Sequence, residues 1–105
     1  MAKKLKPVHP GEILREEFMT PLGLSMNKMA MALRVPVTRI ADVVDERGGI
    51  TADPALRFAR YFKNSATFWM NLQTRYDLEV AEDEIAAKVE RDVQPLETTR
   101  TREDG

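Results

Sequence analysis

The chain has 105 residues, a formal net charge of −1 and no cysteine. Because 43% of its residues are hydrophobic, a single domain with a small core is expected. The lack of cysteine excludes disulfides and thiolate metal sites, and no apolar run approaches the roughly 20 residues of a membrane span. The N-terminus is basic but lacks the apolar core of a signal peptide, so a cytoplasmic location is expected.

The charge is unevenly distributed along the chain. Residues 1–63 hold eleven Lys and Arg against seven acids, whereas residues 77–92 hold seven acids against two bases. A mildly basic body with an acidic end is compatible with a small DNA-binding dimer. It is equally compatible with a protein that has no nucleic-acid partner, so charge alone does not decide between them.

The first predicted element is a helix that follows a flexible basic arm at residues 1–8. His9 stands near its N-cap, Pro10 suits the first helical position, and Glu12 is favoured there by the helix dipole. Its predicted inner stripe comprises Ile13, Leu14, Phe18 and Met19. Residues 20–23, Thr-Pro-Leu-Gly, should end this helix.

Residues 24–47 predict two short amphipathic helices joined by a tight turn. Ser25 is a good N-cap for the first, and Arg34-Val35-Pro36 breaks it, because the residue before a proline avoids helical ψ. The second helix is expected to begin at Pro36. The residues predicted to be buried are Met29, Ala30 and Leu33 in the first helix and Ile40, Val43 and Val44 in the second. This is the layout of a helix-turn-helix, whose second helix enters the DNA major groove.

Two further helices are predicted after Gly48-Gly49. Thr51 should cap the fourth, with an inner face of Ala55, Leu56, Ala59 and Phe62. Ser65 should cap the fifth, which carries Phe68, Trp69, Leu72, Tyr76 and Val80. Ile85, Val89 and Val93 are out of phase with that stripe and indicate a further helix or a helical extension over 82–94. Residues 95–105 are polar and are expected to be disordered.

Four stretches resemble one known family: HPGEILREEFMTPLGLS, RVPVTRI, ITADPALRFARYF and FWMNLQTRYDLEVA. Together they are similar to the HigA-type (VapI-like) antitoxins, within the Xre-type, lambda-repressor-like helix-turn-helix proteins. The resemblance covers about residues 7–82. It implies an all-α fold, a compact five-helix lambda-repressor-like bundle over residues 9–81. It also implies a homodimer that represses its own operon and neutralises a HigB/RelE-like mRNA-cleaving toxin.

The chain departs from this pattern after the second helix of the motif. The family usually has Gly-Lys-Arg there, whereas this sequence has Glu46, Arg47 and Gly48, preceded by Asp45. With standard docking two acids would face phosphates, which should weaken DNA binding or tilt the helix. Met26 also replaces a glutamine that contacts DNA in phage-type relatives, so that contact is expected to be absent.

The second helix of the motif carries the candidate base-reading residues. Arg39 can donate twice to guanine, and Thr38 can offer a hydroxyl or a methyl group to thymine. Val37 could contact a thymine methyl, and Asp42 could accept from cytosine N4 or instead repel a phosphate. The alternative is that these are ordinary solvated residues near a helix start. The candidate phosphate contacts are Asn27, Lys28, Arg34 and Arg47.

No residue pattern indicates catalysis, a cofactor or a metal site. The single histidine, His9, has no cysteine partner, and a capping or surface role is expected. Acidic pairs such as Glu16-Glu17 have no nucleophile or glycine-rich loop nearby. Phe68 and Tyr76 are expected in the core, and one of the adjacent Phe68 and Trp69 should meet a second subunit. The predicted dimer interface comprises Trp69, Tyr76, Ile85 and Val89.

The predicted function is therefore that of a DNA-binding antitoxin that recognises double-stranded operator DNA as a homodimer. Two alternatives stay open at this point. One is a stand-alone transcriptional regulator without a toxin. The other is a protein-interaction module that has lost DNA binding, for which Asp42, Asp45 and Glu46 are the motivating residues.

Overall fold

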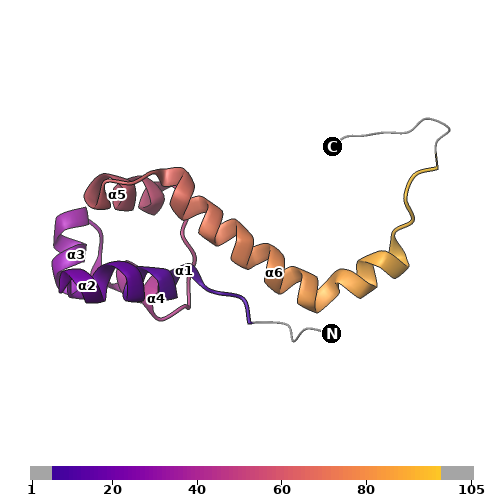
Figure 1. The fold of residues 1–105 in the computed structure, drawn as a ribbon, viewed down its shortest axis with the longest axis horizontal. Coiled ribbons are helices and arrows are strands. Elements are labelled where there is room, and N and C mark those ends of the chain that lie inside the picture. Colours follow the sequence, from indigo (N-terminus) through magenta and orange to yellow (C-terminus); the bar gives the residue numbers. More distant parts are fainter. Residues whose placement is uncertain (1–5, 98–105) are drawn as a thin grey trace.

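The computed structural model describes residues 6–97, and all regular structure in that range is helical (Figure 1). The elements are α1 (Pro10–Ile13), η1 (Leu14–Met19), α2 (Thr20–Leu22), α3 (Met26–Leu33), α4 (Val37–Val44), α5 (Ala52–Phe62) and α6 (Ala66–Asp92). The first three are continuous and form one helix, so the predicted all-α architecture of five helices is confirmed. None of these helices is long and apolar enough to cross a membrane.

The first helix contains a π-helical segment, η1, close to Pro21. The N–H of Thr20 bonds to the carbonyl of Arg15, five residues back instead of four. In an α-helix a proline ring clashes with the carbonyl four residues earlier, and a wider π turn relieves that clash. The helix then ends at Gly23, whose φ of 64° lies in the left-handed region that glycine adopts without strain.

The core lies between the first helix, α3, α4, α5 and the start of α6. The inner residues predicted for α3 and α4 are all buried, as expected: Met29, Ala30, Leu33, Ile40, Val43 and Val44. The prediction for α5 was wrong for Leu56, which is 63% exposed, while Phe58 is buried instead. Ala55 and Phe58 are three residues apart and share a face, whereas Leu56 is turned about 100° away from Ala55.

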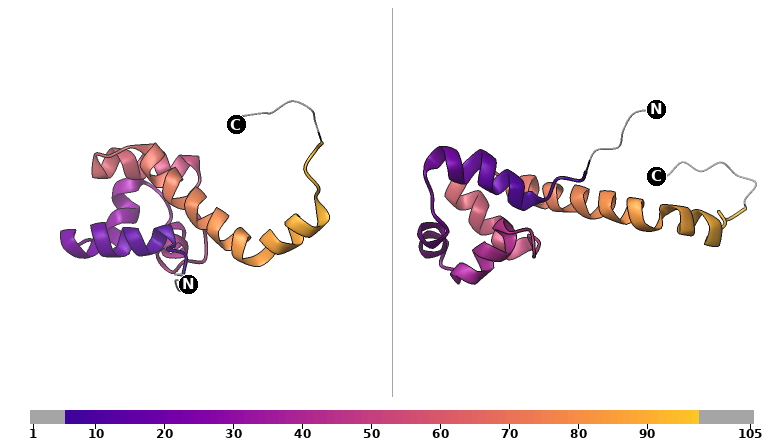
Figure 2. Two further views of the ribbon diagram at one scale, coloured as in Figure 1. Left: turned by 45° about the vertical axis from the view of Figure 1, so that its right-hand side comes forward. Right: turned by 90° about the horizontal axis from the view of Figure 1, so that it is seen from below.

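Helix α6 is one continuous helix of 27 residues that unites the predicted fifth helix with most of the predicted extension. Its first half packs against α5 and α1, and its second half leaves the body (Figures 1 and 2). Every described residue from Glu82 onward is exposed. We call residues 78–92 the α6 arm. The flexible basic arm expected at 1–8 and the disordered tail expected at 95–105 lie largely outside the described residues.

Candidate DNA-binding surface

The helix-turn-helix unit consists of α3, a short turn and α4. The Ser25 hydroxyl begins α3 by accepting a hydrogen bond of 3.0 Å from the N–H of Lys28. Arg34 ends α3 in the left-handed conformation, with a φ of 60°. Pro36 is the N-cap of α4, with an extended ψ of 144°, so the helix begins at Val37. The prediction of a start at Pro36 was therefore wrong by one residue.

The first turn of α4 presents three candidate base-reading residues to solvent. Val37 is 39% exposed, and Thr38 and Arg39 are also exposed. The opposite face of the helix is anchored in the core by Ile40 and Val43, each 1% exposed. The N-terminal residues of a recognition helix are the ones that contact base edges in helix-turn-helix proteins. The N-terminal turn of α4, which would contact the bases, is therefore exposed on the surface of the protein.

Three candidate phosphate contacts lie at the two ends of α3. Asn27 and Lys28 are exposed in its first turn, and Arg34 is exposed in the turn that leads to α4. Within the described range the side chains of Lys28 and Arg34 form no ion pair. Their positive charges are therefore available to an anion beside the exposed turn of α4.

The fourth phosphate candidate, Arg47, is bound to two acids at the end of α4. Its guanidinium lies 3.1 Å from a carboxylate oxygen of Asp42 and 3.1 Å from one of Asp45. The hydrogen bond that Arg47 donates to Asp42, together with the negative charges of Asp42 and Asp45, raises the pKa of Arg47 above its ordinary value. The backbone N–H groups of Arg47 and Gly48 also donate to the Asp42 carbonyl, at 2.8 and 2.9 Å. Asp42, which was predicted to contact a base, and Arg47, which was predicted to contact a phosphate, therefore form an ion pair with each other in the free protein.

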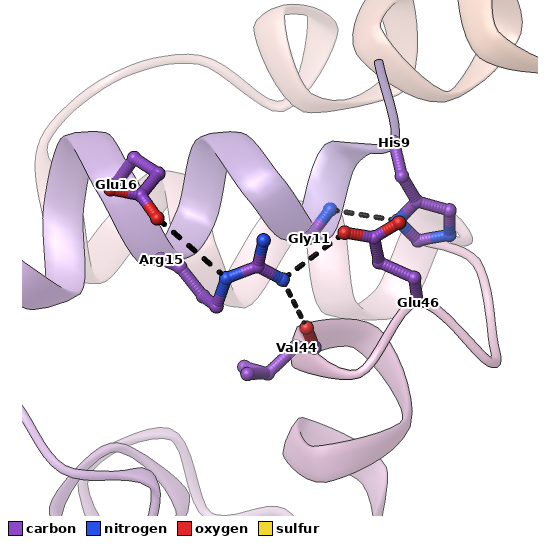
Figure 3. A network of polar contacts seen from close by, with 6 residues as sticks. All are labelled: His9, Gly11, Arg15, Glu16, Val44 and Glu46. Carbon is purple, nitrogen blue, oxygen red and sulfur yellow. Dashed lines mark hydrogen bonds and ion pairs between the residues drawn. The ribbon is translucent and has the colours of Figure 1, made fainter. Parts of the chain in front are cut away.

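Glu46 is held against the first helix by Arg15. Figure 3 shows the Arg15 guanidinium between Glu46, Glu16 and the end of α4. Arg15 Nη1 donates to the Val44 carbonyl at 2.6 Å and to Glu46 Oε2 at 3.2 Å. Glu46 has a φ of 62°, a left-handed conformation that glycine adopts without strain. The acid expected to oppose DNA phosphates is thus partly neutralised within the protein.

The first helix also supports α4 through its backbone. A Cβ added to Gly11 would lie 2.0 Å from the Val43 carbonyl oxygen, so only glycine permits this approach. The expected capping role of His9 is confirmed, because its Nδ1 accepts a hydrogen bond of 2.9 Å from the Gly11 N–H. The buried His9 ring packs edge-on against Tyr76, at a centroid distance of 4.7 Å. These contacts join the end of the recognition helix to α1 and α6.

The structural roles of Gly11 and Arg15 are not predicted from the sequence. Gly11 follows a proline, which is typical of the start of a helix. Arg15 precedes two glutamates, which is typical of a solvent-exposed helical turn. Neither pattern reveals partners 29 to 32 residues away along the chain. The Gly-Lys-Arg departure was the one available signal, because an acid in a glycine position needs some compensating contact.

The residues predicted for the dimer interface fall into two groups. Trp69 is fully buried, with its indole N–H bonded to Asn64 Oδ1 at 2.9 Å, so its assignment to an interface was wrong. Its neighbour Phe68 is 37% exposed, contrary to the expected core position, because adjacent helical residues point about 100° apart. Tyr76 is half-buried against His9, whereas Ile85 and Val89 are 47% and 46% exposed on the α6 arm.

An exposed recognition helix seated on a five-helix body defines the class of protein as helix-turn-helix. No protein-family profile matches the chain. Virulence-associated protein I of Dichelobacter nodosus is 52% identical over 81 residues, which cover 77% of this chain and 75% of that protein. Antitoxin HigA-1 of Vibrio cholerae is 33% identical over 75 residues, which cover 71% and 70%.

The solved structure of the Pseudomonas aeruginosa antitoxin HigA with higBA promoter DNA is also similar. It is 46% identical, with a TM-score of 0.84 over 86% of this chain and 98% of that one. The chain belongs to the HigA-type (VapI-like) antitoxin family of helix-turn-helix proteins. Its relatives are antitoxins and transcriptional regulators rather than enzymes.

Proposed function

We propose that this protein is an antitoxin that binds the operator of its own operon as a homodimer and represses transcription. The observation that carries the proposal is the exposed first turn of α4, where Thr38 and Arg39 stand free of the core. The Pseudomonas aeruginosa relative, which shares the fold, was solved with promoter DNA, and this supports the same use of α4 here.

The proposed docking places the N-terminus of α4 in the major groove. Arg39 would donate twice to a guanine, while Thr38 and Val37 would contact a neighbouring base pair. Asn27, Lys28 and Arg34 would fix the register by contacting phosphates on either side. Two copies related by a twofold axis would read half-sites about one helical turn apart.

Arg47 can contact a DNA phosphate in this docking only if it leaves Asp42 or Asp45. Its two ion pairs are solvent-exposed, and exposed ion pairs contribute little stability. A DNA phosphate can therefore compete with Asp42 and Asp45 for the guanidinium. We infer that Arg47 screens these acids from the phosphates and that its direct contribution to affinity is small.

The second part of the proposed function is neutralisation of a HigB/RelE-like, mRNA-cleaving toxin. It rests on family membership and on the name of the Vibrio cholerae relative. Such an antitoxin would act in the cytoplasm, where the operator and mRNA are found. Co-expression with the product of the neighbouring gene tests it: rescue of growth supports the toxin, and no toxicity of that gene alone favours the stand-alone regulator.

The alternative of an interaction module without DNA binding rested on Asp42, Asp45 and Glu46. Each of these acids lies against an arginine, Arg47 for the first two and Arg15 for the third. Their repulsion of phosphates is therefore offset within the protein, which removes the main reason for that alternative.

A titration of the full chain against DNA from immediately upstream of its gene tests the proposal. A scrambled duplex of equal length is the control, and both are measured at two salt concentrations. We expect preference for the upstream duplex and a fall in affinity as salt rises, because phosphate contacts release counterions. Equal binding of the two duplexes would overturn the proposed repressor.

A further inference from the structure

The loop that joins α4 to α5 is bonded at one end to the recognition helix and at the other end to α6 (Figure 1). Its first half folds back onto α4, because the N–H groups of Arg47 and Gly48 both donate to an α4 carbonyl, at 2.8 and 2.9 Å. Two residues further on, the N–H of Ile50 donates to Oε1 of Gln73 in α6, at 2.7 Å. A single residue, Gly49, separates the two sets of bonds.

The side-chain amide of Gln73 is held in one orientation. Its Nε2 donates to Oδ1 of Asp77, one turn further along α6, at 2.9 Å. The amide oxygen is therefore directed to the N–H of Ile50. Ile50 is 1% exposed and lies in the core, where a backbone N–H needs a partner. Truncation of Gln73 would remove the acceptor of this N–H group.

Gly49 lies directly against the same amide. A Cβ added to Gly49 would lie 2.9 Å from Oε1 of Gln73 and 3.0 Å from both Cδ and Nε2. The φ of Gly49 is not positive, so the backbone itself would accept a side chain at this position. The contact with Gln73, rather than the backbone conformation, therefore favours glycine here.

The next turn of α6 supports the same end of the recognition helix by a second route. Tyr76, three residues after Gln73, packs against His9, which caps α1. Gly11 of α1 closely approaches the Val43 carbonyl in the last turn of α4. One face of α6 thus contacts the loop after α4 through Gln73 and the helix that supports α4 through Tyr76.

We propose that Gln73 is a positioning residue for DNA reading. It lies outside the helix-turn-helix and acts through Ile50 and Gly49, by holding the loop that fixes the C-terminal end of α4. Because α4 has only eight residues, a small shift of that end changes the direction in which Thr38 and Arg39 point. The inference rests on the operator binding of the proposed function and adds a residue of α6 to the groups on which it depends.

A double-mutant cycle measured by operator titration tests the proposal. Gln73→Ala and Gly49→Ala should each weaken operator binding about fivefold or more, because each removes the hydrogen bond that holds the loop. In the Gly49→Ala/Gln73→Ala double variant the glycine change should cause no further loss, since the amide that the new methyl group would meet is gone. All titrations are run well below the melting temperature of each variant.

The cycle separates positioning from a purely structural role. A role in stability alone would lower the melting temperature and leave the operator affinity of the folded protein unchanged. Asn71→Ala, at an exposed position on the same helix, is the matched control and should leave affinity within about twofold of wild type. Wild-type affinity for Gln73→Ala, or equal losses from Gly49→Ala in both backgrounds, would overturn the proposal.

Amide NMR spectra of the free protein test the same contact without DNA. In Gln73→Ala the resonances of Arg47 and Gly48, whose N–H groups bond to α4, should shift together with that of Ile50. A shift confined to Ile50 would mean that the loop keeps its place, and would overturn the proposal. A wild type without operator preference would overturn the proposed function, whereas the spectra decide separately whether Gln73 holds the loop.

Discussion

The guanidinium of Arg15 in the first helix donates to the carbonyl of Val44, in the last turn of the recognition helix, at 2.6 Å. The same nitrogen binds the carboxylate of Glu46 at 3.2 Å. One arginine thus caps α4 and engages an acid that would otherwise be free to repel DNA. The first helix is therefore a support for the DNA-reading surface as well as part of the core.

Replacing Arg15 by methionine should weaken operator binding about tenfold. The change leaves the Val44 carbonyl without its donor and frees the negative charge of Glu46. Loss of a hydrogen bond of this kind costs about 1 kcal/mol of stability. Fluorescence anisotropy with an operator duplex, beside a thermal melt, checks both effects.

The Arg15→Met/Glu46→Gln double variant is the control for this charge effect. It should recover most of the lost affinity without recovering the lost stability, because only the repulsion is removed. If affinity stayed low in the double variant, Glu46 would have no electrostatic role at the DNA surface.

Replacing Gly11 by alanine should destabilise the protein by about 2–3 kcal/mol, because the new methyl group would overlap the Val43 carbonyl. Gly23→Ala is a matched control, since its Cβ would meet nothing within 4 Å and only the left-handed φ opposes it. That control should cost about 1 kcal/mol. Urea unfolding measures both, and equal losses would mean that the Gly11–Val43 approach can relax.

Replacing Arg34 by glycine should raise stability while lowering affinity for DNA. Its φ of 60° is strained for a residue with a side chain, so glycine should gain about 0.5–1 kcal/mol. Lys63→Gly, at a φ of 62° outside the helix-turn-helix, should give a similar gain with no change in affinity. Unfolding and anisotropy titrations test the pair. Unchanged DNA affinity for Arg34→Gly would remove Arg34 from the phosphate contacts.

Residue type and helical period predict the structure correctly where local chemistry decides it. The Ser25 cap and the buried faces of α3 and α4 follow from residue type and helical period, and all are observed. The prediction is wrong where two adjacent apolar side chains compete for one position that faces the core. Trp69 takes the core position and Phe68 does not, because the buried indole N–H of Trp69 donates a hydrogen bond to Asn64 Oδ1. Helical period alone does not make that choice.

The second kind of failure concerned partners far apart in the sequence. The pairing of Arg15 with Glu46 depends on how the first helix crosses the end of α4, which periodicity does not encode. The sequence alone therefore predicts that the acids after α4 are free charges. The pairing of Asp42 with Arg47, five residues apart, was similarly missed, because the loop bends back onto α4.

Replacing Asp42 by alanine distinguishes its two possible roles at the DNA surface. In our account the change frees one interaction of Arg47, so affinity for any duplex should rise and the salt dependence should steepen by about one phosphate contact. If Asp42 instead accepts a hydrogen bond from cytosine, affinity for the operator alone should fall. Anisotropy titrations with operator and scrambled duplexes at two salt concentrations decide between these outcomes.

The most direct test of the central claim is the affinity of Arg39→Ala for the operator. A lost bidentate contact to guanine should cost about 1–3 kcal/mol, while binding to a scrambled duplex should change little. Arg75→Ala, on the exposed side of α6, is the control and should leave both affinities unchanged. A specific loss for Arg39→Ala is the result we predict. An unchanged operator affinity would contradict the assignment of α4 as the helix that reads DNA.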